Sequence, residues 1–488
     1  MTITCVYKIN FNIFDIEAVY SRVTKYKPVM TTKNQTPEVS RRKFLQSAAV
    51  AAIAPSILMN SFTASAKAPG SKLRHACIGV GGMGGYDLSN FKSHPDVEIV
   101  AICDVDSDIL KKAAEGLPGV RMYSDWRELF KKEAKNIDSV NVSVPDHMHF
   151  SIAYRAIKAG KHVYCQKPLC HDVAEVRSLT KAAIKAGVTT QLGTQIASSA
   201  CDRTAVQLIK DGVIGKIKHA YLCSNRSGAV EFRMVEPQPA QNPPANLNWD
   251  LWLGTGPVRP YAPGIYHQAK WRSWQDFGTG WSGDIGCHIF DAVWKGLGLK
   301  APISVQAEVL QAWKNAPEKR KENWPWADHI TWVFPGNAFT ESDKLTLEWF
   351  DGEMFPPQEV RKLYTSGNYP EECALLVGTE GALLIPHGGE KPVLLPQDKF
   401  KDKEVLKIEG RNHYHHFVNA CLGGEKTESH FAQTGPMTEA ILLGTVAIRV
   451  PDQLLQWDAA NMKFPNNPEA NKYLKRKYRK GWEIEGEF

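Results

Sequence analysis

The sequence predicts an α/β protein in which a doubly wound parallel sheet is followed by a second α/β domain with a large, mostly antiparallel sheet. Three observations predict this fold. From residue 75, short β-branched runs alternate with helical stretches, as in parallel sheets joined by helical crossovers. A glycine-rich turn directly follows the first run. The alternation stops near residue 196, and 488 residues are enough for two or three domains.

The first domain is expected over residues 73–196. Its β-branched runs predict strands at His75–Val80, Val97–Cys103, Ser139–Val144, Lys161–Cys165 and Thr189–Leu192. The intervening segments predict helices at Gly82–Ser93, Ser107–Glu115, Phe150–Ala159 and Val173–Ala186. Strands and helices in this order favour right-handed crossovers and a parallel sheet.

The second domain is expected over residues 197–450, followed by a charged tail at 451–488. A stretch rich in Pro, Asn and Trp, Pro237–Pro263, predicts a long surface loop. Strands of a more antiparallel sheet are expected at Ser304–Trp313, Ile330–Phe334, Lys344–Trp349 and Ala374–Leu376. A final helix is expected at Met437–Val450.

Composition excludes several classes of protein. Apolar residues make up 43% and charged residues 23%, which are globular values, and a mean hydropathy of −0.32 argues against a polytopic membrane protein. The net charge of +7 comes mainly from residues 1–66, which hold eight Lys/Arg and three Asp/Glu. No basic stripe remains for nucleic acid, so no nucleic-acid partner is expected.

The leader at residues 1–66 resembles a twin-arginine export signal. Arg41 and Arg42 precede a mildly apolar, alanine-rich stretch that is too short for a permanent membrane span. Ala64–Ala66 has the small-x-small pattern of a signal-peptidase site, so cleavage after Ala66 is expected. We therefore expect a periplasmic or otherwise exported protein with no stable membrane anchor. Met1 and Met30 both stay open as the start of translation.

The glycine-rich turn predicts a dinucleotide site. Gly79, Gly81 and Gly84 satisfy G-x-G-x-x-G after a strand, and with Gly82 and Met83 they place a helix N-terminus where backbone N–H groups meet the pyrophosphate. Asp104 closes the second strand, where a carboxylate can bond the ribose hydroxyls. Because no arginine adjoins Asp104, the pattern favours NAD over NADP.

Two further motifs show a family resemblance. Val144–His149 (V-P-D-H-M-H) and Tyr164–Leu169 (Y-C-Q-K-P-L), taken with the glycine turn, resemble the Gfo/Idh/MocA family of oxidoreductases. The resemblance implies a Rossmann domain and a C-terminal domain whose open sheet faces the nicotinamide and forms a homo-oligomer, a dimer or tetramer. It places Pro145, His149 and Gln166 at the cofactor.

The resemblance also implies the catalytic groups. Lys167 matches the lysine of the family's Glu-Lys-Pro tripeptide, which stabilises the developing alkoxide, although Gln166 here replaces the glutamate. Asp284 and His288, four residues apart, match the family's catalytic pair, with the histidine as base. Trp271 and Arg272 match a pair near the nicotinamide.

Five tryptophans between residues 249 and 281 allow either sugar stacking or packing of the long loop, and packing is favoured for most. The histidines at 413, 415 and 416 lack partners at ligand spacing, which favours polar packing at a helix start over a metal site.

The motifs together predict an exported, NAD-dependent oxidoreductase that takes a hydride from a secondary hydroxyl of a sugar or sugar derivative. The alternative is a redox-neutral, NAD-using glycosidase that oxidises, eliminates and then reduces. An exported enzyme meets no pool of free nicotinamide, so a non-dissociating NAD is expected with either activity.

Overall fold

The structure is a computed structural model that describes residues 72–226, 236 and 238–484. The predicted export signal and its cleavage after Ala66 lie outside these residues. None of the helices in the described ranges is both long and apolar enough to cross a bilayer. The same ranges hold no group of three or more His, Cys, Asp or Glu arranged to bind a metal ion.

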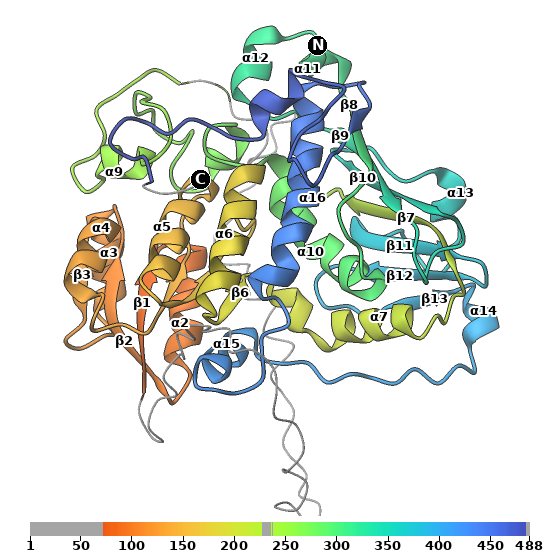
Figure 1. The fold of residues 1–488 in the computed structure, drawn as a ribbon, viewed down its shortest axis with the longest axis horizontal. Helices are drawn as coiled ribbons and strands as arrows, with labels where there is room; N and C mark the ends of the chain where they lie inside the picture. The colour runs from red at the N-terminus through yellow and green to blue at the C-terminus, as the bar shows by residue number, and fades with distance from the viewer. Residues whose placement is uncertain (1–71, 227–235, 237, 485–488) are drawn as a thin grey trace, which may run out of the picture. The chain divides into compact units, whose positions relative to one another are not determined.

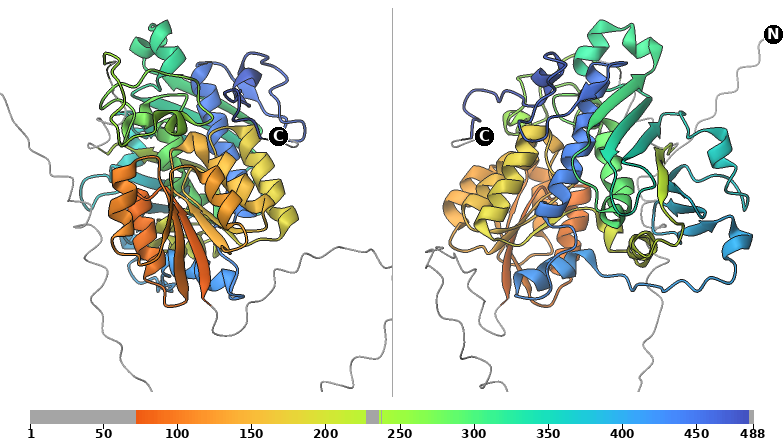
Figure 2. Two further views of the ribbon diagram at one scale, coloured as in Figure 1. Left: turned by 90° about the vertical axis from the view of Figure 1, so that its left-hand side faces the viewer. Right: turned by 45° about the vertical axis from the view of Figure 1, so that its right-hand side comes forward.

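The first sheet has six parallel strands in the order β3-β2-β1-β4-β5-β6, the doubly wound order of a Rossmann fold (Figure 1). Its strands are β1 (Leu73–Ile78), β2 (Val97–Cys103), β3 (Arg121–Tyr123), β4 (Ser139–Val142), β5 (His162–Cys165) and β6 (Thr190–Leu192). Helices on both of its faces are α2 (Met83–Lys92), α3 (Ser107–Ala114), α4 (Trp126–Glu133), α5 (Asp146–Lys158) and α6 (Val173–Ala186) (Figure 2, left). The predicted parallel domain is confirmed.

The second sheet has eight strands in the order β13-β12-β11-β7-β10-β9-β8-β14, and every neighbouring pair is antiparallel except β7 and β10. The strands are β7 (Ile217–Ser224), β8 (Ser304–Val309), β9 (Asp328–Pro335), β10 (Lys344–Asp351), β11 (Glu372–Gly378), β12 (Ala382–Pro386), β13 (Val393–Leu395) and β14 (Leu455–Gln456). The predicted, mostly antiparallel second sheet is likewise confirmed.

The second part also contains helices, and some of them contact elements of the first part. They are α7 (Ala200–Lys210), α9 (Trp249–Leu253), α10 (Gly280–Leu297), α11 (Gln311–Lys314), α12 (Pro317–Glu322), α13 (Gln358–Arg361), α14 (Gln397–Phe400), α15 (His413–Cys421) and α16 (Phe431–Arg449). Short 3-10 turns lie at Gln195–Ser198, Lys270–Ser273 and Ala470–Tyr473. α16 packs between α6 and α10, so apolar side chains from both sheets form one continuous core (Figure 1).

Several expected elements differ from the structure. The strand expected at Ser304–Trp313 ends at Val309, because the chain then turns into α11 and Trp313 packs back onto the core. The last helix begins at Phe431 and not at Met437, the residue after Pro436. The helix continues through Pro436, and most of its side chains are buried. The expected loop at Pro237–Pro263 contains α9.

The segment expected as a charged tail is packed against the first sheet. The backbone N–H of Ala174 donates to the carbonyl of Leu474 at 3.0 Å, and Arg476 forms an ion pair with buried Glu175. Trp482 is also buried. The last segment of the chain passes from α16 across the ends of α6 and α5 (Figure 1). The charge of Arg476 therefore belongs to the folded body, whereas Lys475, Lys477 and Lys480 are exposed.

Candidate active site

The turn between β1 and α2 is shaped for a dinucleotide. Gly79 has φ +81°, and a Cβ there would lie 2.2 Å from the carbonyl oxygen of Ser143, so only glycine fits. Gly82 caps α2 without a side-chain hydrogen bond, and a Cβ on Gly82 would enter open space. The first turn of α2 also lacks an acidic residue. The helix N-terminus thus offers uncapped N–H groups to an anionic pyrophosphate.

Asp104 is fixed at the end of β2, as the ribose-binding role requires. Its carboxylate accepts from the backbone N–H of Val80 at 2.9 Å and of Asp106 at 3.0 Å. Burial raises the pKa of Asp104, and these two N–H groups act against that rise. The bond from Val80 joins the Asp104 carboxylate to the glycine turn. The ribose-binding and pyrophosphate-binding parts of the predicted site are therefore held together.

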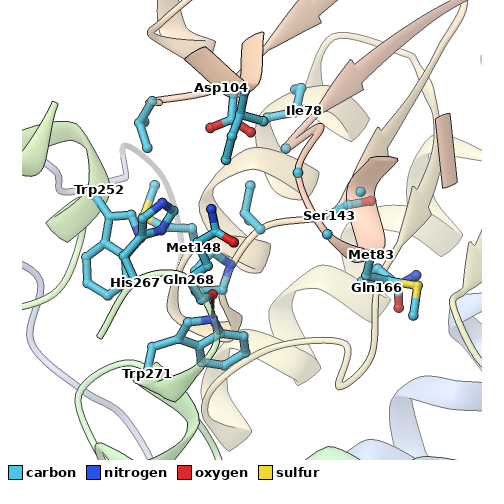
Figure 3. A pocket seen from close by; sticks show the side chains of 18 of the residues that line it. Ile78, Met83, Asp104, Ser143, Met148, Gln166, Trp252, His267, Gln268 and Trp271 are labelled. Atoms are coloured by element: carbon cyan, nitrogen blue, oxygen red, sulfur yellow. Dashed lines mark hydrogen bonds between the residues drawn. The ribbon is translucent and has the colours of Figure 1, made fainter. Parts of the chain in front are cut away.

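A cavity of about 300 Å³ begins at this turn. One wall comes from the glycine turn and the strand ends, with Asp104, Pro145, Gln166 and Lys167. The facing wall comes from α9 and the segment after it, with Trp252, His267, Gln268, Trp271 and Arg272 (Figure 3). Lys167 and Arg272, which line the cavity from its two walls, both donate to Asp284 and not to Asp104. The residues present fit NAD.

The facing wall is fastened to the end of β2. The backbone N–H of Ser107 donates to the carbonyl of Asn246 at 2.8 Å, and that of Asn248 donates to Val105 at 2.9 Å. The side-chain amide of Asn246 donates to Asp106 at 2.9 Å. These bonds hold the long loop closed over one end of the cavity.

Most of the five tryptophans pack this loop. Trp249 stacks on Trp252 with ring centroids 4.6 Å apart, and Trp274 donates to the carbonyl of Ile265 at 2.7 Å. Trp281, on α10, donates to Ser224. Trp252 and Trp271 also line the cavity. One aromatic cluster therefore both packs the long loop and forms part of the cavity wall.

Lys167 and Asp284 meet across the two domains. The Lys167 ammonium donates to Asp284 Oδ1 at 2.6 Å, and Arg272 Nε donates to Oδ2 at 3.1 Å. The Lys167 and Asp284 side chains are 12% and 6% exposed. Although burial opposes ionisation, Lys167 and Arg272 together lower the pKa of Asp284. Lys167 and Arg272 line the cavity, whereas the buried Asp284 that pairs with both is not among its lining residues.

Asp146 belongs to the same group, although the sequence reasoning gave it no role. It lines the cavity and accepts from the backbone N–H and hydroxyl of Thr279 at 3.2 and 2.9 Å. Within the described ranges, its buried Oδ1 has no hydrogen-bond partner. Burial and the charge of Asp284 raise the pKa of Asp146 to about 7, against the pull of Arg272 and Lys167. A carboxyl that titrates there can hold or release a proton at neutral pH.

His288 lies one turn after Asp284 on α10 but does not line the cavity. Its ring centroid is 5.2 Å from that of His387, which follows β12, and its buried Nδ1 has no hydrogen-bond partner among the residues that the structure describes. Burial, with His387 and Lys167 nearby, holds the pKa of His288 well below its usual value. The ring is therefore neutral at pH 7, the form that accepts a proton.

His149 lies behind the cavity wall. Its ring nitrogens are 2.7 Å from the carbonyl oxygen of Pro168 and 2.8 Å from that of Val144. It joins the end of β4 to the turn that carries Lys167, so it positions the lysine instead of contacting the cavity.

The three histidines near residue 413 pack at the start of α15. Asn412 caps this helix, and His413 contacts Ser198 Oγ at 2.7 Å. His415 contacts Ser93, and His416 contacts Arg411. Polar packing at a helix start describes all three.

Gln166 has a charged partner that the sequence did not indicate. Its amide nitrogen lies 3.0 and 2.9 Å from the two carboxylate oxygens of Asp87, a fully buried residue of α2. Asp87 also accepts from Ser143 at 2.6 Å and Tyr414 at 2.7 Å. Burial nevertheless raises the pKa of Asp87 to about 6. An uncharged, donating Gln166 is what a carboxylate at position 87 requires.

We expect Gln166→Glu to destabilise the protein by about 2–4 kcal/mol near pH 8, because two buried carboxylates then adjoin. The loss should shrink below about pH 6, where Asp87 takes up a proton. Chemical denaturation at both pH values measures it. Adding Asp87→Asn should restore stability, and Gln195→Glu, which faces tyrosine hydroxyls, serves as control. A loss that does not change with pH would contradict the charge pairing.

Comparison with known proteins agrees with this arrangement. Residues 73–194 match the Gfo/Idh/MocA oxidoreductase family, NAD-binding Rossmann fold, and residues 229–361 match its C-terminal alpha/beta domain. A glycosyl hydrolase family 109 protein of Stenotrophomonas maltophilia is 29% identical over 48% of this chain and 50% of its own. Myo-inositol 2-dehydrogenase of Thermotoga maritima is 31% identical over 30% of this chain and 42% of its own. These matches span half or less of the relatives' length.

Solved structures share the fold. The WlbA dehydrogenase of Chromobacterium violaceum, in complex with NADH and UDP-GlcNAcA, is 16% identical and covers 80% of this chain and 98% of its own with a TM-score of 0.57. The aldose–aldose oxidoreductase of Caulobacter crescentus is 18% identical over 79% of this chain and 100% of its own, with a TM-score of 0.52. With its glycine turn, Lys167 tripeptide and two matched domains, the chain belongs to the Gfo/Idh/MocA family of oxidoreductases with an NAD-binding Rossmann fold.

Proposed function

We propose that this protein is an NAD-dependent oxidoreductase that acts on a secondary hydroxyl of a sugar or sugar derivative. The observation that carries the proposal is the buried group of Lys167, Asp284 and Arg272 at the wall of a cavity that fits NAD. Bound NAD supplies the hydride acceptor. The Lys167 ammonium binds the substrate oxygen and stabilises the charge that develops there as its proton leaves.

Asp284 holds Lys167 in place through the 2.6 Å bond, and Arg272 keeps the carboxylate ionised. His288 Nδ1, neutral and without a hydrogen-bond partner in the described part of the chain, accepts the hydroxyl proton. Asp146, with a pKa of about 7, provides a second place for a proton beside the same group.

The second candidate is a redox-neutral glycosidase that uses the same residues. Relatives named glycosyl hydrolase family 109 proteins favour it, one of them matching 48% of this chain. In this reaction, oxidation of the C3 hydroxyl acidifies the proton on C2, beside the anomeric carbon. Elimination then releases the aglycone, water adds at the anomeric carbon, and the hydride returns to the C3 ketone. A panel of free sugars and synthetic glycosides separates the two. Net NADH formation supports the oxidoreductase, and aglycone release without net NADH supports the glycosidase.

Export by the twin-arginine route and assembly through the second sheet belong to the same proposal and rest on the sequence alone. For an exported enzyme, retention of the cofactor is required. We expect roughly one NAD(H) per chain to survive gel filtration and to appear on denaturation. Protein that releases no nucleotide, yet needs added NAD for activity, would contradict retention and leave the site assignment intact.

The bonds that fasten the long loop to the end of β2, next to Asp104, support retention of NAD. A variant of this loop can therefore be added to the experiment. Asn246→Ala removes the bond to Asp106 and should release NAD about tenfold faster, the value of one hydrogen bond to a charged group. Asn136→Ala is the matched control, because Asn136 likewise donates to a carboxylate, Glu133, away from the cavity. Equal release rates in both variants would contradict a role for the loop.

A further inference from the structure

A second cavity, of about 370 Å³, shares no lining residue with the dinucleotide cavity. It lies between the turn after Lys167 (His171–Val173), the C-terminal end of α16 and the chain at residues 472–477. Six basic residues line it: Lys321, Arg449, Lys472, Lys475, Arg476 and Lys477. Two acidic residues, Asp172 and Asp276, also line it.

Both acids already have partners, and one partner is a basic residue of the cavity, because Asp172 lies 3.7 Å from Arg476. Asp276 forms an ion pair with Arg259 at 2.5 Å. Asp172 accepts from the backbone N–H of Glu175 at 2.9 Å and of Arg476 at 3.2 Å. Both carboxylates are thus engaged at the cavity wall, and the cavity keeps an excess of positive charge.

Some of the basic residues form ion pairs with glutamates that do not line the cavity. Glutamates pair with three of them: Lys321 with Glu318, Lys472 with Glu469, and Arg476 with Glu175. Arg449 differs from these. In the described part of the chain no carboxylate lies within ion-pair distance of its guanidinium, and its Nε is buried without a hydrogen-bond partner.

Aromatic rings hold Arg449 in this position. Its guanidinium carbon lies 4.9 Å from the ring centroid of Trp324 and 5.0 Å from that of Tyr473. Stacking orients the planar guanidinium but gives its Nε–H no acceptor in the described residues. Burial lowers the pKa of Arg449 to about 10, against the attraction of Asp276 and Asp172 from beyond ion-pair distance, so it still carries its charge at neutral pH. A charged arginine with a buried, unpartnered Nε–H is costly unless an anion occupies the site.

His171 supplies a second unsatisfied donor. It is 8% exposed, and in the described residues neither of its buried ring nitrogens has a partner at full hydrogen-bond geometry, although the Gln275 backbone acts weakly on the ring. Burial, with Arg476 and Arg449 nearby, holds its pKa well below the usual value. A neutral imidazole offers one N–H to an acceptor.

We propose that Arg449 and His171 form a binding site for a phosphate group, either free phosphate or a phosphate monoester. The guanidinium fork matches the oxygens of a tetrahedral oxyanion, and a neutral histidine adds a donor from another direction. A neutral ligand would leave the charge of Arg449 unpaired. The cavity is large enough for a small phosphorylated compound.

The test uses the full-length protein with saturating NAD, so that the glycine turn is already filled. Inorganic phosphate, a hexose phosphate and sulfate are titrated calorimetrically against chloride at equal ionic strength. We expect phosphate or its monoester to bind and to raise the melting temperature, whereas chloride does neither. The tighter of these two ligands identifies the source of the phosphate group.

Arg449→Met should weaken binding about 10- to 100-fold, as expected when a charge-assisted bidentate contact is lost. Arg361→Met is the matched control, since Arg361 also stacks on an aromatic ring, Phe355 at 5.1 Å, but lies outside the cavity. Without phosphate, Arg449→Met should be at least as stable as the wild type. His171→Gln gives an independent reduction in affinity if the arginine variant does not fold. No phosphate binding above chloride, or equal binding by wild type and both site variants, would overturn the proposal.

Discussion

Replacing Lys167 with methionine is expected to lower turnover by about two to three orders of magnitude, the usual effect of removing a donor that stabilises a developing oxyanion. The substitution keeps most of the unbranched side chain but removes the ammonium that bonds Asp284 at 2.6 Å. Among the described residues it leaves Asp284 with Arg272 as its one basic partner, so a loss of about 3–5 kcal/mol in stability is expected as well.

The protein contains a close control for this double effect. Lys295 forms an ion pair with Asp291 at 2.7 Å on the same helix, α10, with side-chain exposures of 13% and 2%. Lys295→Met should therefore cost similar stability but spare turnover. Steady-state kinetics and denaturation of both variants separate the two effects. If the two variants lost turnover equally, the loss would reflect stability, and the catalytic role of Lys167 would be rejected.

The sequence predicted the first sheet well because its signals are local. The bounds of α6 follow from a cap at each end: Asp172 accepts from the backbone N–H of Glu175, and Gly187 closes the helix with φ +64°. β2 is an apolar run interrupted by the exposed Glu98, and its predicted bounds match the structure. In contrast, β3 was missed because it has three residues at the sheet edge and little apolar character.

The candidate site divides in the same way. Gly79, Asp104 and Lys167 were identified because motif and chemistry lie together in the sequence, and the structure brings them to one cavity. Asp87 and Asp146 were missed, although Asp146 belongs to the Val144–His149 motif and Asp87 lies three residues after Gly84. Their roles depend on burial and on distant partners.

Two contacts show why the rest of the site was not predictable. Tyr414, which bonds Asp87, is 327 residues away in the chain. Arg476 lies 301 residues from Glu175, and its charge suggested a solvated tail. Neither contact leaves a periodicity, a spacing or a composition that sequence reasoning can use.

Replacing His288 with alanine should lower turnover by about two to four orders of magnitude, the scale of general-base loss, while NAD binding stays nearly unchanged. NAD affinity should hold because His288 does not line the dinucleotide cavity. Since burial lowers the pKa of His288, only its neutral form is present at pH 7, and acid removes it well below pH 6.5. The low-pH limb of kcat/KM in the wild type should therefore lie below that value and be absent from the variant.

His387→Leu provides the matched test of the neighbouring ring. His387 contributes to lowering the pKa of His288, so its removal should shift the low-pH limb of kcat/KM to higher pH while turnover at neutral pH is largely kept. Steady-state rates from about pH 5 to 9 for the three proteins decide the matter. If His288→Ala kept more than about a tenth of wild-type turnover, general-base catalysis by this ring would be rejected. The hydroxyl proton would then have to pass to Asp146. This carboxyl lines the cavity, lies close enough to Lys167 and Asp284 for their charges to act on it, and has a pKa of about 7.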